Sequence, residues 1–323
     1  VGMADKVDQQ VIDTFRRSSL LLDMLTFDNS ISPGTGGSTL AYGYIQLKTP
    51  STAAVRALNT EYTAGEAKRE EKTAKAVIMG GSFEVDRVLQ NTSGAVDELA
   101  FQAQQKIKAT ANYFHNLVIN GTSASSGTGY VVNTFDGLRK ALTGTSNDFT
   151  TDIDLSDSTK MDSNANAFVD QLDQLTHMVD GGASLLLMNT AMLLKVRAAA
   201  RRAGYYDRKK DDFGRAVEYF GDIPIMDAGM YYNGTKSVDV IDTSTASASA
   251  AGTSSIYAVN IALDGFHGIS PTGTGVINSY MPDLKAPGAV KKGEVELVAG
   301  VVLKNTLKAA ALNGIALKAK ASV

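Results

Sequence analysis

The sequence predicts an α+β fold, and three observations carry this prediction. Residues 93–121 place apolar side chains at helical spacing over the longest such stretch in the chain. Residues 40–50, 77–89 and 294–319 alternate apolar and polar side chains, as half-buried strands do. Between them, residues 164–204 follow the order helix, short apolar strand, helix. This order indicates helices packed on a sheet.

Composition limits the possible functions. The chain has 323 residues, of which 44% are hydrophobic and 20% charged, so it can bury a substantial core in one large or two ordinary domains. A net charge of −3 provides no broad basic surface for nucleic acid. Cysteine is absent, which excludes disulfides and thiolate metal sites. No run of 18 apolar residues exists, so we expect no membrane-spanning segment.

The N-terminal part is predicted to be a helix followed by a loop. Residues 5–26 form an amphipathic pattern, and residues 32–39, rich in glycine and serine, indicate an extended arm or hinge. The strands expected at 40–50 and 77–89 then flank a charged segment, and Gly80-Gly81 suggests a bulge or bend in the second strand.

A hairpin with such a polar middle buries little by itself, and isolated hairpins are marginal in water. We therefore expect it to lie on its own domain or on a neighbouring subunit. The charged run is read either as a solvated face or as an intersubunit contact, and the sequence favours neither. The residues of that candidate contact are Lys68, Arg69, Glu70, Glu71 and Lys72.

The helix over residues 93–121 is interpreted as a structural spine, with an ordinary core helix as the alternative. At 1.5 Å per residue it would be roughly 40 Å long. Ser93 is the predicted N-cap, and Asn120-Gly121 is the predicted stop, with Gly121 in the left-handed conformation. The predicted core face consists of Val96, Leu99, Ala103, Ile107, Phe114 and Leu117.

The remaining elements follow from the same patterns. We expect helices at residues 134–144, 164–181 and 190–204, the last with Thr190 as its N-cap, and strands at 183–189, 238–243 and 255–263. Residues 294–319 favour a pair of long strands that return beside the spine helix.

No catalytic, cofactor or metal site is found in the sequence. None of the three histidines has a second ligand at metal-binding spacing, and neither a phosphate-binding loop nor a G-x-S-x-G nucleophile motif occurs. Asp152, Asp154 and Asp157 resemble a calcium loop only loosely, so a turn before the next helix is the preferred interpretation.

The order of charged hairpin, spine helix, α/β insertion and returning strands resembles the major capsid proteins of tailed bacteriophages. These proteins have the Hong Kong 97 fold, which encapsulin shells share. The resemblance is carried by SPGTGGSTLAYGYIQLKTPSTAA, AKREEKTAKAVIMGGSFEVDRVL, FHNLVINGT followed by FDGLRKAL, LDGFHGISPTG, and APGAVKKGEVELVAGVVLKNTLKAA. It implies an N-terminal arm at 1–38, an extended loop at 39–90, a peripheral domain at 91–130 plus 288–323, and an axial domain at 131–287.

The resemblance also implies a function. The chain would be a non-enzymatic major capsid protein that assembles with many copies of itself into pentamers and hexamers. These would form an icosahedral phage head that encloses double-stranded DNA without sequence-specific binding. Scaffolding, portal and decoration proteins are the implied partners, and assembly in the cytoplasm of a host bacterium is the implied location before release as a virion. An encapsulin-type compartment is the first alternative, and an enzyme with a carboxylate site at residues 152–157 is a distant second.

Overall fold

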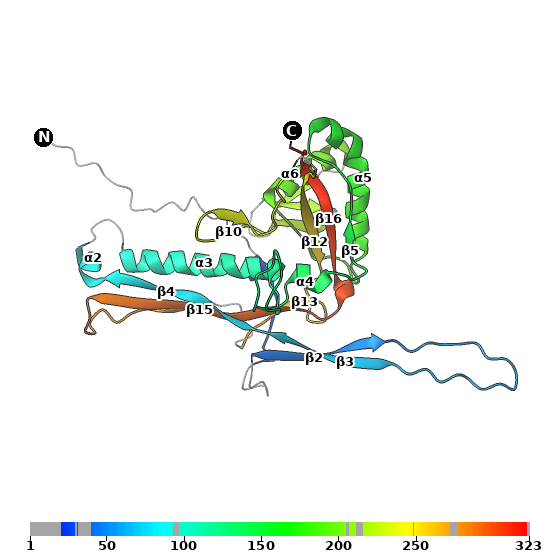
Figure 1. The fold of residues 1–323 in the computed structure, drawn as a ribbon, viewed down its shortest axis with the longest axis horizontal. Helices are drawn as coiled ribbons and strands as arrows, with labels where there is room; N and C mark the ends of the chain where they lie inside the picture. Colours follow the sequence, from blue (N-terminus) through cyan, green and yellow to red (C-terminus); the bar gives the residue numbers. More distant parts are fainter. Residues whose placement is uncertain are drawn as a thin grey trace.

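The computed structural model describes residues 21–29, 31, 40–92, 97–204, 207–210, 216–247, 249–271 and 277–321. Within these ranges the chain forms two large sheets, one long helix that lies along the first sheet, and a two-stranded ribbon that projects away from both (Figure 1). The elements therefore divide into an elongated layer, a second body of helices on a sheet, and an arm.

The long helix is α3 (Glu98–Asn120), the predicted spine. Its N-cap is Asp97, whose side chain accepts a hydrogen bond from the backbone N of Ala100 at 3.2 Å. The prediction of Ser93 as the cap is wrong, and Ser93 itself lies outside the described residues. Gln90 completes the cap, because its amide donates to Asp97 and its oxygen accepts from the backbone N of Leu99, both at 2.9 Å.

The end of α3 confirms the stop at Asn120-Gly121, but not the predicted backbone conformation. Gly121 has φ −67°, so it does not take the left-handed form. Glycine is needed there for space, since a Cβ atom would lie 2.6 Å from the carbonyl oxygens of both Leu117 and Phe135. The next segment packs so closely against the helix end that position 121 has room only for glycine.

The first sheet lies beneath α3 and is built around the long strand β15. Strand β4 pairs antiparallel with β15 from Val77 opposite Ala299 to Asp86 opposite Val290. The ladder has no register shift at Gly80-Gly81, so of the predicted bulge or bend, the bulge is wrong. A Cβ atom at Gly80 would fall 1.9 Å from the carbonyl oxygen of Val295, which is why the position is glycine. The strands of this sheet are β1 (Phe27–Asp28), β13 (Phe266–Ile269), β15 (Val290–Leu303), β14 (Asn278–Tyr280) and β4 (Val77–Asp86).

The projecting ribbon consists of β2 (Ala41–Thr49) and β3 (Lys68–Lys75), which pair antiparallel. The two strands expected to flank the charged segment therefore do not pair with each other. The charged segment is itself a strand that pairs with β2, whereas β4 leaves the ribbon to join β15. The reason is burial: Met79, Phe83 and Val85 of β4 are buried at the first sheet, and β3 has no comparable apolar face.

The second sheet has the strand order β5-β16-β12-β6-β9-β8-β7 within the described ranges. The prediction that both C-terminal strands return beside the spine helix is only half right. β15 does so, but β16 pairs with β12 in the second sheet. The strands of the second sheet are β5 (Asp148–Thr150), β16 (Ala309–Lys318), β12 (Gly252–Val259), β6 (Leu185–Met188), β9 (Ile223–Asp227), β8 (Ala216–Phe220) and β7 (Asp207–Lys210).

Alternating side chains give the second sheet two buried faces. On β6, Leu186 and Met188 face the helices α5 and α6, whereas Leu185 and Leu187 face the C-terminal half of α3. The latter core also contains apolar residues of β15, so it joins the second sheet to the elongated layer. The covering helices are α4 (Leu138–Leu142), α5 (Ser158–His177) and α6 (Thr190–Arg202).

Several boundaries differ from the predictions. Helix α5 begins at Ser158, six residues before the predicted start, and the N-cap of α6 is Asn189 instead of Thr190. Of the helix predicted over residues 5–26, only α1 (Leu21–Met24) falls within the described ranges. The remaining elements are α2 (Arg87–Thr92), β10 (Met230–Tyr232), β11 (Ser237–Asp239) and a 3-10 turn η2 (Thr306–Lys308).

Candidate self-association surface

The β2–β3 ribbon extends beyond the rest of the molecule, and its outer loop reaches furthest (Figure 1). Every residue from 50 to 67 is exposed. The loop carries one local turn, in which the backbone N of Thr60 donates to the carbonyl of Ala57 at 3.3 Å. Because its side chains are uncovered, this segment gains no stability from burial in the single chain.

The five charged candidates lie together on β3, and all are exposed. Because neighbouring residues on a strand point to opposite faces, Arg69 and Glu71 lie on one face, and Lys68, Glu70 and Lys72 on the other. Glu70 forms an ion pair with Lys48 of β2 at 3.4 Å. An exposed pair of this kind contributes little to stability, about 1 kcal/mol or less. The charges therefore remain available to a partner.

Apolar side chains on the ribbon were not among the predicted contact residues. Ile45 and Leu47 lie on the same face of β2 and are 69% and 61% exposed. They face opposite Glu71 and Arg69 on β3, so the face combines two large apolar groups with one charge of each sign. The alternation in residues 40–50 could have revealed this pair, since it placed Tyr42 and Tyr44 on the other face.

The base of the ribbon is fixed to the body by Tyr42. Its hydroxyl donates to Asp28 Oδ2 at 2.9 Å, and its ring lies edge-on to His267 and beneath the Lys304 ammonium group. Gln46 adds a hydrogen bond from Nε2 to the carbonyl of Lys304 at 2.9 Å. The ribbon is thus held at one end and free at the other.

The predicted core face of α3 is distributed over two cores. Phe114 and Leu117 are fully buried in the core shared with the second sheet, and Ala103 is buried between the helix and the first sheet. Leu99 and Ile107 are partly buried beside Ala103. Val96 lies outside the described residues.

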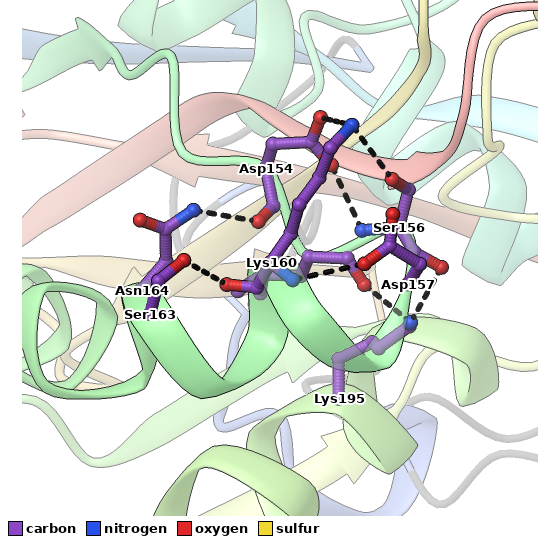
Figure 2. A network of polar contacts seen from close by, with 8 residues as sticks. Asp154, Ser156, Asp157, Lys160, Ser163, Asn164 and Lys195 are labelled. Carbon is purple, nitrogen blue, oxygen red and sulfur yellow. Dashed lines mark hydrogen bonds and ion pairs between the residues drawn. The ribbon is translucent and has the colours of Figure 1, made fainter.

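Of the three aspartates of residues 152–157, Asp154 and Asp157 lie at the turn before α5 (Figure 2), and Asp152 is exposed. Asp157 is the N-cap and accepts from the backbone N of Lys160 at 2.9 Å. Asp154 forms an ion pair with Lys160 Nζ at 2.6 Å, which lowers the pKa of Asp154 despite its partial desolvation. Lys195 of α6 donates to the carbonyl of Ser156 at 3.2 Å. These contacts stabilise the turn before α5, which is the interpretation that the sequence favoured.

Within the described ranges there is no group of three histidine or acidic side chains that could hold a metal ion. His115 and His267 are buried and separate, and burial lowers the pKa of each. None of the helices in the described part of the chain is long and apolar enough to cross a membrane.

The projecting ribbon exposes large apolar side chains in the single chain, and comparison with known proteins identifies the family of the chain. The sequence matches the model of the SU10 major capsid protein family over residues 6–264. The chain belongs to the SU10 major capsid protein family. It is therefore a structural protein that builds shells from many copies and forms part of a virion, and it is not an enzyme. No curated protein sequence matches the chain significantly.

Solved structures agree with this assignment at the level of the fold. A chain of the SrpI encapsulin complex from Synechococcus elongatus PCC 7942 aligns with a TM-score of 0.65 and 13% identity, covering 100% of this capsid protein and 95% of that chain. A chain from Mycobacterium phage Bobi aligns with a TM-score of 0.61 and 15% identity, and the alignment covers 96% of this protein and 95% of that chain. A chain from the capsid of Myoviridae phage XM1 aligns with a TM-score of 0.58 and 14% identity, and the alignment covers 96% of both chains.

The resemblance to a Hong Kong 97-type capsid protein is thus confirmed. The encapsulin likeness rests on the shared fold alone, because the identity is 13%, whereas the family match is one of sequence. The family match therefore decides between the two shell types in favour of a phage capsid.

Proposed function

We propose that the β2–β3 ribbon is the arm by which each capsid subunit holds its neighbour in the shell. The observation that carries this proposal is the exposure of Ile45 and Leu47 on a ribbon that has no cover of its own. A two-stranded ribbon is marginal in water, and a paired apolar face gains stability when another surface covers it. The neighbouring subunit supplies that surface.

The charges on β3 would determine the register of this contact. Lys68, Arg69, Glu70, Glu71 and Lys72 can pair with charges of opposite sign on the neighbour, which favours one register over others. The ribbon of one subunit would contact a different part of the neighbouring subunit, so the contact is heterologous. Heterologous contacts form rings when the rotation between neighbouring subunits closes, and pentamers and hexamers are the rings we propose. Many weak contacts then act together to hold the shell.

We propose the domain division given above for this arrangement. The arm would comprise residues 1–38, the extended loop 39–90, the peripheral domain 91–130 plus 288–323, and the axial domain 131–287. We amend this division at one place: because β16 pairs with β12, we propose that residues 309–318 belong to the axial domain and not to the peripheral domain. The axial part would then point toward the centre of each ring.

The proposed content of the shell is double-stranded DNA, bound without sequence specificity. A net charge of −3 suits a wall that does not bind packed phosphates tightly. Scaffolding, portal and decoration proteins would be the partners, and a host bacterial cytoplasm the place of assembly. Nuclease-protected DNA in purified particles would support this content. Particles that instead hold one co-purified cargo protein would contradict it and favour a compartment.

The arm is tested with the double variant Ile45→Ser/Leu47→Ser. We expect subunits that unfold at the same temperature as the wild type but form no shells in negative-stain images and sedimentation. Leu194→Ser is the matched control, because Leu194 is an exposed leucine on α6, away from the ribbon. Normal shells from the double variant would overturn the proposal, as would equal loss of shells in the control.

A further inference from the structure

The chain contains three asparagine–glycine pairs, and the structure sets one of them apart. Asn120-Gly121 ends α3, Asn313-Gly314 lies within β16, and Asn233-Gly234 belongs to the loop between β10 and β11. Such a pair can react with itself, because glycine has no side chain to shield its backbone nitrogen from the preceding side-chain amide. What distinguishes the three pairs is therefore how the fold holds each of them.

The pairs in α3 and β16 are held by hydrogen bonds and by packing. Asn120 Nδ2 donates to the carbonyl of Val240 at 2.7 Å. Asn313 Nδ2 donates to Asp148 Oδ1 at 2.6 Å. Both following glycines are in close contact with other backbone, since a Cβ atom on either would lie within 2.6 Å of a carbonyl oxygen. Closing a ring between side chain and backbone at either pair would break the helix or the strand locally.

The β10–β11 loop leaves its pair open. Residues 233–236 are all exposed, and nothing lies within 4 Å of the position that a Cβ atom of Gly234 would take. Within the described ranges, neither Asn233 Nδ2 nor the backbone N of Gly234 takes part in a hydrogen bond. The nitrogen that would attack and the nitrogen that would leave are thus both unhindered.

The carbonyl oxygen of the same side chain is held in place. Asn233 Oδ1 accepts hydrogen bonds from the backbone N of Thr235 at 3.0 Å and from that of Lys236 at 2.9 Å. These bonds fold the carboxamide toward the backbone that follows it, which includes the nitrogen of Gly234. They also place two donors at the oxygen where negative charge develops if that nitrogen attacks. Hydrogen bonds to a charged oxygen are about twice as strong, so the donors favour the reaction intermediate over the resting amide.

We propose that Asn233 is a self-modification site, which converts to aspartate and isoaspartate in the folded protein. The backbone nitrogen of Gly234 loses its proton to hydroxide and bonds to Asn233 Cγ. The Cγ–Nδ2 bond then breaks, and the nitrogen takes a proton from water and leaves as ammonia. Water adds to either carbonyl of the resulting five-membered succinimide and opens the ring. The net reaction consumes one water and releases one ammonia, so it needs no further reactant.

The modification adds one negative charge to the tip of the hairpin in each subunit. The aspartate product keeps the turn, because a carboxylate accepts the same two hydrogen bonds. The isoaspartate product lengthens the backbone by one methylene group, which weakens the pairing of Tyr232 with Ser237 beside the loop. The hairpin packs beside α3 and not on the projecting ribbon (Figure 1), so the site is independent of the proposed arm.

Peptide mass spectrometry of unassembled subunits, incubated at mildly alkaline pH, tests the site. We expect Asn233 to convert about fivefold faster in the folded subunit than in the guanidinium-unfolded chain, which is the factor for one net hydrogen bond. Asn120 and Asn313 are the matched controls, and folding should slow each of them about a hundredfold, because they react only after local unfolding. Asn233→Gln should give no product there, since its longer side chain does not form the five-membered ring.

Three outcomes would overturn the self-modification site. The first is a conversion of Asn233 that is no faster in the folded subunit than in the unfolded chain. The second is an equal rate at all three asparagines in the folded subunit. The third is aspartate without isoaspartate, which shows direct hydrolysis instead of attack by the backbone. Far-UV circular dichroism at the end of the incubation shows that the folded samples stayed folded, so the rates report on the native loop.

Discussion

The Tyr42 hydroxyl donates a hydrogen bond to Asp28 Oδ2 at 2.9 Å and so connects the base of the projecting ribbon to β1. The Tyr42 ring is buried in a small core with Ile269 and Val302. This contact determines where the ribbon leaves the body. Strand β2 therefore carries two kinds of residue. Tyr42 packs against the body of its own chain, whereas Ile45 and Leu47 are exposed and can contact a neighbour.

Tyr42→Phe should lower the free energy of unfolding by about 1 kcal/mol, since it removes one hydrogen bond and keeps the ring. Tyr42→Ala should lower it by about 3–5 kcal/mol, because it also leaves a cavity. Urea unfolding of unassembled subunits measures both. Tyr62→Phe is the control, since Tyr62 is exposed in the outer loop and should change stability by less than about 0.5 kcal/mol. An equal effect in Tyr42→Phe and Tyr62→Phe would contradict the anchoring role.

Gly80→Ala should destabilise the first sheet strongly. A Cβ atom there would meet the Val295 carbonyl oxygen at 1.9 Å, and because both groups are backbone of paired strands, the ladder itself must shift. Overpacking of this kind costs about 1–3 kcal/mol or more. Gly43→Ala on β2 is the matched control, since its Cβ atom would lie at an ordinary 3.5 Å from Glu71 Oε1. Thermal unfolding of both variants is the measurement, and equal melting temperatures would refute the interpretation.

The sequence predicted which segments form strands better than which strands pair. Residues 68–75 are mostly charged, so they read as a polar segment. They form a strand because β2 offers backbone groups that need partners, and this pairing requires no buried side chains. Pairing of β4 with β15 and of β16 with β12 joins segments far apart in sequence, and local alternation does not encode the choice of partner.

The candidate surface was also only partly predictable from local sequence patterns. The charged residues of β3 stand out in the sequence because they are consecutive. The alternation within residues 40–50 places Ile45 and Leu47 on one face of a strand, but it does not indicate that this face is left uncovered by the rest of the chain. The spine helix was predictable because its periodicity is local. Its cap was not, since Asp97 and Ser93 are both good capping residues.

Phe114 is the largest fully buried side chain of α3. It is fully buried and packs against Phe27 and Phe135, so it ties the helix to β1 and to the segment that follows the helix. Phe114→Ala should cost about 3–5 kcal/mol. Lys108→Ala, on the exposed face of the same helix, should change stability by less than about 0.5 kcal/mol. Comparable unfolding midpoints in urea for these two variants would show that the helix is not the spine of the fold.

His115 makes the stability of the subunit depend on pH. Burial lowers its pKa to about 4, and its Nε2 atom accepts a hydrogen bond from the backbone N of Leu22 at 3.3 Å, which requires the neutral ring. In the unfolded chain the pKa is about 6.5, so below that pH the unfolded state binds a proton that the folded state does not. The stabilisation is therefore complete above pH 6.5 and is lost progressively as the pH falls toward 4.

We expect His115 alone to lower the free energy of unfolding by about 2 kcal/mol between pH 7 and pH 5. His267 also has a lowered pKa, because of burial and the nearby Lys304, so the wild type should lose more than this in total. His115→Gln keeps an acceptor for Leu22 without titrating, and the difference between its pH profile and that of the wild type isolates His115. Urea unfolding of unassembled subunits at each pH gives the profiles. Parallel profiles for the two proteins would contradict a buried neutral His115.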